Sequence, residues 1–358
     1  MNGLESYREK TVFITGHTGF KGSWLCLWLE QLGARVVGYS LPPPTSPSLF
    51  QQANIARGIE HHVGDVRDAD ALTTALVTAQ PDYVFHLAAQ PLVLDSYAAP
   101  AETFAINVTG SINLMEGLRR LSRPAAVVMV TTDKVYLNRE WNYAYREDDP
   151  LGGHDPYSAS KAAMEVAVAS WRASFFSAAN SAVRMASARA GNVIGGGDWS
   201  ANRIVPDLVR ALQSNVRPVL RNPGSLRPWQ HVLEPLAGYL LLGARLAGEG
   251  GRAFTGAWNF GPLPTDVRSV GGLAEAFLMH SGRPGWDDAS GGAALHEATL
   301  LRLAIDKSAA LLGWRPAWDF DQTVAHTAGW YAAVGAGQTA REACLADLAD
   351  YGAVAGIG

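Results

Sequence analysis

The sequence predicts an α/β fold in which a doubly wound parallel sheet is followed by a smaller, mixed lobe. Short β-branched and aromatic runs alternate with helical stretches through the first half of the chain, which is typical of a parallel sheet with crossover helices. A glycine-rich turn directly after the first run indicates a Rossmann-type start. After Gly191 the alternation gives way to loops rich in glycine, proline and tryptophan. We therefore expect a dinucleotide-binding domain over 1–190 and mainly a substrate-binding lobe over 191–358, with some segments returning to the first domain.

Each element follows from its local pattern. Residues 11–15 are mostly β-branched or aromatic and end at Gly16, and the apolar helical pattern over 19–32 is closed by Gly33. Further strands are expected at 35–39, 59–63, 83–87, 127–131 and 182–188. Helices are expected at 68–78, 99–121, 156–176, 204–213 and 233–247. The proline-rich stretch 42–47 predicts a rigid surface loop, and the Ala- and Gly-rich tail beyond Val334 predicts a peripheral segment.

Composition narrows the class of protein. With 358 residues, of which 48% are hydrophobic and 17% charged, the chain is long enough for a large core. A formal net charge of −4 gives no reason to expect a nucleic-acid or anionic-membrane partner. The two cysteines, Cys26 and Cys344, lie far apart, so a reducing compartment fits. No signal-type or membrane-spanning apolar run is visible, and we expect a cytoplasmic protein.

The turn after the first expected strand has the pattern G-x-x-G-x-x-G. Its glycines permit a tight turn and a close approach of backbone to a pyrophosphate, and the helix that follows supplies oriented N–H groups. The pattern alone is common, but its place between a strand and a helix makes it specific. The residues that we expect at the cofactor here are Gly16, Thr18, Gly19, Phe20, Lys21 and Gly22.

Later strand ends supply the other expected cofactor contacts. The second strand ends at Ser40 without the acidic residue that usually holds an NAD ribose. Asp65 and Val66 follow the third strand, where an adenine would lie. Leu87, Ala88 and Ala89 end the fourth strand with small residues, although ordinary packing explains the alanines equally well. The histidines at 17, 61 and 62 lack ligand spacing, so no metal site is expected.

Tyr157 and Lys161 form a candidate base for hydride transfer. They lie four residues apart on one face of an expected helix, so the ammonium can stabilise a phenolate and lower the pKa of the phenol. The pair alone is weak evidence, because a lysine above a half-buried tyrosine is common on helices. Whether the pair indicates catalysis depends on the residues that lie beside it.

Thr132, Asp133 and Lys134 lie at the carboxyl end of an expected strand, near the same edge of the sheet as Tyr157. A ketone at one sugar carbon acidifies the neighbouring C–H, so water can then be eliminated with an acid and a base or stabiliser. Asp133 fits the acid if burial keeps it protonated, and Lys134 fits either a base or an electrostatic stabiliser. An ordinary Asp-Lys turn at a strand end is the alternative.

Several long strings make the chain similar to the extended short-chain dehydrogenase/reductases, specifically their CDP-glucose 4,6-dehydratase branch. The resemblance runs over about 11–318, and its Asp133-Lys134 pair resembles this branch rather than the dTDP-glucose branch, which carries Asp-Glu. The strings are TGHTGFKGSW (15–24), PPTSPSLF (43–50), AAQPLV (88–93), NREW (138–141), DPYS (155–158), RAGNVIGGGDW (189–199) and RPWQHV (227–232).

The resemblance implies bound NAD and CDP-D-glucose as substrate. Tyr157, helped by Lys161 and Thr132, would remove the O4 proton during oxidation at C4, water would leave across C5 and C6 with Asp133 and Lys134, and the hydride would return to C6. The product would be CDP-4-keto-6-deoxy-D-glucose, an intermediate of deoxysugar biosynthesis for cell-surface polysaccharides such as O-antigen. Further implied cofactor contacts are Gln90, Asn107, Thr131, Tyr157 and Lys161.

The resemblance also implies a substrate site and an assembly. The implied substrate contacts are Gln90, Asn192, Arg203, Leu220, Arg221, Arg227 and His231, although a surface ion pair is an alternative for Arg203. A homodimer or dimer of dimers would pair the helices at 99–121 and 156–176. The chain has Leu94-Asp95 where relatives often carry a basic residue, and His296-Glu297 receives no role. An epimerase or reductase on this scaffold and a non-catalytic dinucleotide sensor are the competing functions.

Overall fold

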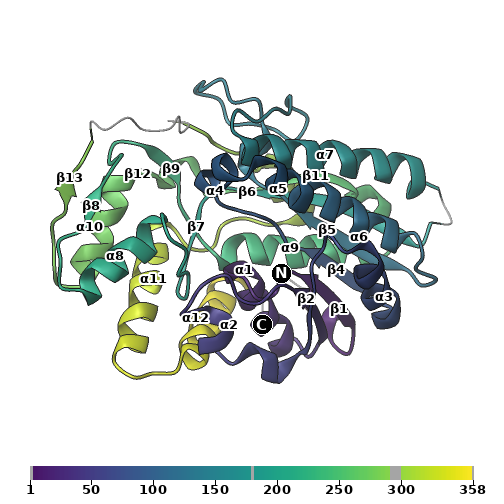
Figure 1. The fold of residues 1–358 in the computed structure, drawn as a ribbon, viewed down its shortest axis with the longest axis horizontal. Coiled ribbons are helices and arrows are strands. Elements are labelled where there is room, and N and C mark those ends of the chain that lie inside the picture. The colour runs from purple at the N-terminus through teal and green to yellow at the C-terminus, as the bar shows by residue number, and fades with distance from the viewer. Residues whose placement is uncertain (1–2, 179–180, 291–299, 357–358) are drawn as a thin grey trace.

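A seven-stranded parallel sheet forms the centre of the computed structural model, which describes residues 3–178, 181–290 and 300–356. The strands lie in the order β11-β6-β5-β4-β1-β2-β3 (Figure 1). They are β1 (Thr11–Thr15), β2 (Arg35–Ser40), β3 (Glu60–Val63), β4 (Tyr83–His86), β5 (Ala125–Val130), β6 (Val183–Ala190) and β11 (Gly256–Phe260). β1 pairs with β2 on one side and with β4 on the other, so the strand order changes direction between β1 and β4. A ligand crevice is expected at the carboxyl ends of the strands at such a point.

The predicted doubly wound sheet is confirmed, with strand ends shifted by a few residues. One strand was not anticipated: β11 comes from the second half of the chain and pairs with β6, Gly256 opposite Ala186. Its sequence, GAWNF, is too short and too glycine-flanked to stand out from the loops around it. The division of the chain at residue 190 stays a prediction.

Helices cover both faces of the sheet because side chains alternate along each strand. On one face, Phe13 and Val127 pack with residues of α3 (Ala69–Ala79), α6 (Gly110–Leu118) and α7 (Pro156–Phe175). On the other face, Ile14 and Val128 pack with residues of α1 (Phe20–Gln31) and α9 (Leu233–Ala247). Both cores are buried, so the strand tips are held rigidly at the crevice.

The helix expected at 99–121 is built in three parts. α5 (Pro100–Phe104) and α6 are joined by one π-helical turn, Ala105–Thr109, with helical backbone throughout. α7 begins at Pro156 as expected, because the Asp155 side chain accepts a hydrogen bond from Ser158 N and proline occupies the first helical position. This cap fixes the start of α7 next to Tyr157.

A smaller lobe follows the sheet. It contains α8 (Ile204–Gln213), α10 (Val270–His280) and α11 (Phe320–Gly335), which share a separate core, and short two-stranded pairs. These short strands are β7 (Val193–Ile194), β8 (Val219–Leu220), β9 (Leu226–Pro228), β10 (Gln230–His231), β12 (Val267–Ser269) and β13 (Asp287–Asp288). In Figure 1 this lobe lies to the left of the sheet.

The tail beyond Val334 is not peripheral, and that expectation was wrong. It forms α12 (Ala340–Ala355), whose Cys344 and Tyr351 are fully buried against the main core. The Tyr351 hydroxyl donates to Glu234 Oε2 of α9 at 2.8 Å. The high content of alanine and glycine does not indicate a peripheral segment here, because small residues allow helices to pack closely. Among the described residues, no helix is long and apolar enough to cross a membrane.

Candidate active site

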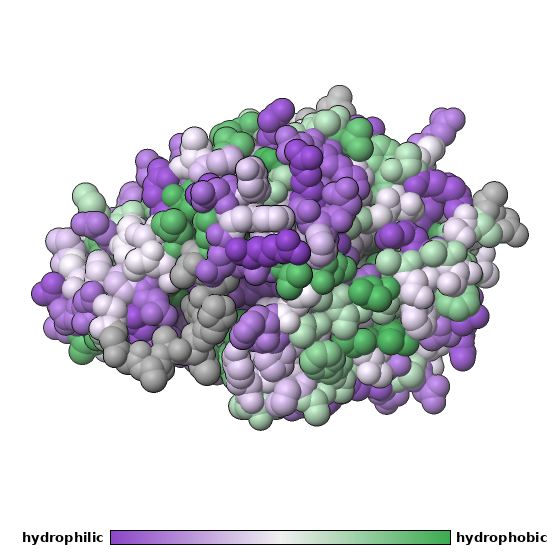
Figure 2. Space-filling model, turned by 90° about the horizontal axis from the view of Figure 1, so that it is seen from above, coloured by the Kyte–Doolittle hydropathy of each residue, from purple (hydrophilic) through white to green (hydrophobic). Residues whose placement is uncertain are grey.

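The carboxyl ends of the central strands bring the expected catalytic residues together. Thr132 follows β5, Asp133 opens a short 3-10 helix (Asp133–Val135), and Tyr157 lies in the first turn of α7. The Thr132 hydroxyl hydrogen-bonds with the Tyr157 phenol and lies 3.0 Å from Asp133 Oδ1, so the phenol and the carboxyl lie in one site. Figure 2 shows the upper face of the molecule hollowed between the small lobe on the left and the sheet-bearing part on the right.

The glycine-rich turn fits a dinucleotide pyrophosphate. Gly16 has φ +78°, and a Cβ there would lie 2.6 Å from Ala88 N. A Cβ at Gly22 would lie 2.2 Å from Gly16 O, so only glycine permits this packing of helix on strand. Gly19 is the N-cap of α1 and provides no side-chain cap, which leaves the first N–H groups of the helix directed at the turn. The residues present therefore suit a phosphate-bearing cofactor.

The next strand ends shape the rest of the cofactor crevice. Thr18 Oγ1 lies 2.8 Å from Ser40 Oγ and joins the turn to the end of β2. Asp65 is paired with Arg67, Oδ2 to Nη2 at 2.6 Å, and Val66 is buried against Gly110. The backbone of Ala88 lies directly on the Gly16 turn, and a contact between Ala88 and a cofactor stays a prediction.

Gln90 and Asn107 are engaged by the protein. The Asn107 amide donates to Ser160 Oγ at 2.8 Å and to Gln90 O, and its carbonyl accepts from Gln90 N. The Gln90 side chain donates to Leu92 O at 3.0 Å. These contacts tie the loop after β4 to α7 and favour a supporting role for both side chains. Direct contact with cofactor or substrate stays a prediction.

The environment of Tyr157 is enclosed and polar. Burial raises the pKa of Tyr157 to about 12, and a hydrogen bond with Thr132 and the charge of Arg203 oppose the rise. Lys161 lies one turn along, where its Nζ donates to Val130 O at 3.2 Å. Burial lowers the pKa of Lys161 to about 8. Desolvation therefore raises the pKa of the phenol by more than the neighbouring groups lower it. The sequence predicts a lowered pKa instead.

Asp133 has the environment of an acid. Burial raises its pKa, against the charges of Lys134 and Arg227 and a hydrogen bond that Thr132 donates to Oδ1 at 3.0 Å. A raised pKa favours the protonated form, which elimination requires. Lys134 is partly exposed beside it. Whether Lys134 acts as a base or as an electrostatic stabiliser stays open.

Some expected substrate residues lie near Tyr157 and Asp133. Arg203 forms an ion pair with the buried side chain of Asp198 at 2.9 Å, and the charge of Arg203 also acts on Tyr157. The charge of Arg227 acts on Asp133. Asn192 follows Gly191, where a Cβ would lie 3.0 Å from Asp133 Oδ2. A diphosphate next to these two guanidinium groups would be well neutralised.

Other expected substrate residues lie further off or are enclosed. Leu220 is buried in the core of the small lobe, and Arg221 is exposed, with Nη2 donating to Asn202 at 3.4 Å. His231 is fully buried between the rings of Trp24 and Trp318, at 5.9 and 4.9 Å between ring centroids. The enclosed ring of His231 therefore packs against these tryptophans, and its contact with substrate stays a prediction. His296 and Glu297 lie outside the described residues.

Sequence reasoning missed Tyr239 of α9. Its hydroxyl accepts a hydrogen bond from Lys21 Nζ at 3.3 Å, and its charge interactions reach both Tyr157 and Asp133. Burial lowers the pKa of Lys21 to about 7, with Arg203 adding to the effect. A tyrosine within an apolar helix pattern gives no local signal, so only the fold reveals this neighbour.

Known proteins match this chain in sequence and in fold. A model described as "NAD dependent epimerase/dehydratase family" matches residues 12–255. The chain belongs to that family. A CDP-glucose 4,6-dehydratase of Salmonella typhimurium is 44% identical over 352 residues, covering 96% of this chain and 97% of the relative. A probable dTDP-glucose 4,6-dehydratase of Sinorhizobium fredii is 26% identical over 348 residues, covering 89% of this chain and 92% of the relative.

Solved structures of the epimerase/dehydratase fold agree. The epimerase Mth375 of Methanothermobacter thermautotrophicus superposes with a TM-score of 0.77 at 22% identity, covering 93% of this chain and 95% of that one. A dTDP-glucose 4,6-dehydratase of Bacillus anthracis in complex with NAD gives 0.73 at 18% identity, covering 90% and 96%. At such identities the likeness establishes the fold alone.

Proposed function

We propose that this chain is an NAD-dependent CDP-glucose 4,6-dehydratase, a hydro-lyase that forms CDP-4-keto-6-deoxy-D-glucose and water. The observation that carries the proposal is the convergence of Tyr157, a hydride-step base, with Asp133, a buried carboxyl whose pKa is raised, at one edge of the sheet. The 44% identical CDP-glucose 4,6-dehydratase, matched along nearly its whole length, supports the nucleotide. Such a product would serve deoxysugar biosynthesis.

The residues divide the reaction between them. When bound in the glycine-lined crevice, NAD⁺ supplies the acceptor for the C4 hydride, its return at C6, and a positive ring that favours phenolate. Tyr157 accepts the O4 proton, and Lys161 contributes positive charge behind it. Asp133 donates a proton to the leaving C6 hydroxyl. Lys134 removes the acidified C5 proton or stabilises the enolate. Arg203 and Arg227 hold the diphosphate.

Turnover with defined sugar nucleotides tests this function. The purified protein, supplied with NAD⁺ and CDP-, dTDP- or UDP-glucose in turn, is expected to release a 4-keto-6-deoxy product from CDP-glucose most efficiently. Mass spectrometry of the product detects the loss of one water. A hexose product that keeps its C6 hydroxyl would replace the dehydratase with an epimerase or reductase. Binding without turnover would indicate a dinucleotide sensor.

The activity is expected to fall as the pH rises through about 8, where Lys161 loses its proton. The sign follows from the role of the ammonium: its positive charge, present below this pKa, stabilises phenolate at Tyr157. The pH dependence of kcat/KM in the wild type and in Lys161→Arg measures it. The guanidinium stays charged, so the variant should lose the alkaline fall even if its activity is lower. An unchanged fall in Lys161→Arg would assign it to another group.

We further propose that the protein is a homodimer, or a dimer of dimers, through the helices at 99–121 and 156–176, which include α5 and α7. Phe104 and Val166 are large apolar side chains on these helices, 38% and 60% exposed. Burying them against a second copy would stabilise the assembly. Sedimentation of the wild type should give at least a dimer, and Phe104→Glu should give more monomer. A wild type that sediments as a monomer contradicts this proposal.

A further inference from the structure

A buried ion pair lies behind the candidate active site. Glu165 on α7 and Arg189 near the end of β6 are each 4% exposed, and the distance from Nε to Oε1 is 2.9 Å. A second contact, from Nη2 to Oε2, is 3.1 Å, so the guanidinium holds the carboxylate with two nitrogen atoms. The proposed reaction assigns neither residue a role.

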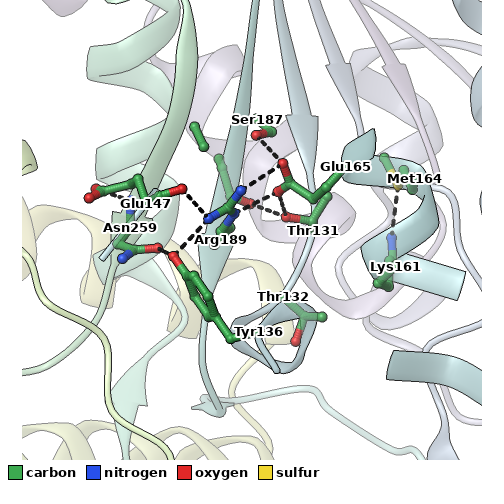
Figure 3. A network of polar contacts seen from close by, with 12 residues as sticks. Thr131, Thr132, Tyr136, Glu147, Lys161, Met164, Glu165, Ser187, Arg189 and Asn259 are labelled. Carbon is green, nitrogen blue, oxygen red and sulfur yellow. Dashed lines mark hydrogen bonds and ion pairs between the residues drawn. The ribbon is translucent and has the colours of Figure 1, made fainter. Parts of the chain in front are cut away.

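This pair reaches both ends of the segment that carries the proposed acid. Upstream, the Thr131 hydroxyl donates to Glu165 Oε1 at 2.6 Å. Downstream, Arg189 Nη1 donates to the Tyr136 phenol oxygen at 2.8 Å, and the guanidinium lies 4.9 Å from the centroid of that ring. Figure 3 shows Arg189 between Glu165 and Thr131 on one side and Tyr136 on the other. Residues 132–135 therefore run between two fixed points.

Bonds inside the segment are weak by comparison. Lys134 N to Thr132 Oγ1, Val135 N to Thr132 O and Tyr136 N to Asp133 O are all 3.4 Å. Typical N–H···O bonds are about 2.9–3.0 Å, so this single 3-10 turn holds its own shape poorly. The short, buried contacts to the ion pair at both ends, together with the bonds from Gly152 N to Val135 O and from Thr131 N to Ala188 O, each at 2.8 Å, hold its position instead.

We propose that Glu165 and Arg189 form a positioning clamp, which holds Thr131 and Tyr136 and thereby places Asp133 and Lys134 for the elimination step. Arg189 also fixes the end of β6, where Gly191 packs against Asp133 Oδ2. Tyr157 depends less on the clamp, because the cap from Asp155 and the hydrogen bond from its N–H to Ser96 Oγ at 3.1 Å anchor the start of α7 separately. The assignment of elimination as the affected step rests on the proposed function.

Conservative variants loosen one end of the clamp at a time. Thr131→Val and Tyr136→Phe each remove one hydroxyl and keep the shape of the side chain. Ser187→Ala is the matched control, because the Ser187 hydroxyl donates to the same carboxylate at 2.7 Å but from the middle of β6. Thr131→Ser restores the donor and serves as rescue. Thermal melting and NAD⁺ binding check that every variant is folded.

Two readouts separate positioning from general destabilisation. In a single turnover of CDP-glucose, Thr131→Val and Tyr136→Phe should form product at least about tenfold more slowly than wild type. Reduced nicotinamide should accumulate in them, because oxidation outpaces elimination. Amide hydrogen exchange of the protein alone should be faster across 131–136 in both variants. Ser187→Ala should resemble wild type in all of these, and Thr131→Ser should move each readout of Thr131→Val back toward wild type.

Product formation close to the wild-type rate in both loosened variants would overturn the clamp, as would a Ser187→Ala variant that matches them in every readout. Wild-type protein that forms no keto product from CDP-glucose would contradict the proposed function instead. In that case hydrogen exchange alone tests the clamp. Unchanged exchange across 131–136 in both loosened variants would contradict the clamp.

Discussion

Replacing Tyr157 by Phe is expected to lower kcat for CDP-glucose by about 10²–10⁴-fold while changing KM little. The substitution keeps the ring that packs at the start of α7 and removes only the oxygen that Thr132 and Arg203 surround. Without that oxygen, no base is placed for the O4 proton, so oxidation at C4 should fail at the outset. In a single turnover the variant should therefore form product at this reduced rate and accumulate no reduced nicotinamide.

A second buried tyrosine provides the control. Tyr7→Phe removes a hydroxyl that donates to Leu240 O at 2.7 Å, away from the strand tips. It should cost about 0.5–1.5 kcal/mol of unfolding free energy and leave kcat unchanged. If Tyr157→Phe turned over at the wild-type rate, another group would have to be the base of the hydride step.

The parts of the site that the sequence could predict are those with short-range patterns. The glycine turn needs a strand before it and a helix after it, and both are visible around Gly16 and Gly22. Tyr157 and Lys161 are recognisable because helical spacing places them on one face. Asp133 stands out because a polar segment follows a run of valines, which marks a strand tip.

The parts that the sequence could not predict depend on contacts between distant segments. Arg189 and Glu165 are separated by 24 residues, and only the packing of β6 on α7 joins them. Glu165 does lie on the same helix face as Tyr157 and Lys161, a signal that could have drawn attention to it. The burial of His231 between two tryptophans and the docking of α12 through Tyr351 have no local signature.

The pKa of Tyr157 illustrates the same limit in electrostatics. Helical spacing predicts that Lys161 lowers it, but spacing says nothing of how deeply the phenol is buried. In the folded protein, desolvation is the larger effect, and Lys161 itself is directed to Val130 O. Charge that favours the phenolate must therefore come from several groups, and Arg203 is one that the fold supplies.

Replacing Asp133 by Asn is expected to separate the two halves of the reaction. An amide of the same shape accepts the hydrogen bond from Thr132 but cannot protonate a leaving hydroxyl. Oxidation at C4 should survive because Tyr157 is intact, whereas loss of water should slow by about 10²–10⁴-fold. Reduced nicotinamide should therefore build up in a single turnover, the opposite of the result for Tyr157→Phe.

Asp266→Asn controls for the loss of a buried carboxyl as such. Burial raises the pKa of Asp266 as it does that of Asp133, but Asp266 lies in the small lobe, where it accepts from Phe320 N at 3.4 Å. This variant should turn over without accumulating reduced nicotinamide. If Asp133→Asn lost oxidation and dehydration to the same extent, Asp133 would serve the site as a whole. The assignment of a separate elimination acid would then be wrong, and the contrast with Tyr157→Phe would disappear.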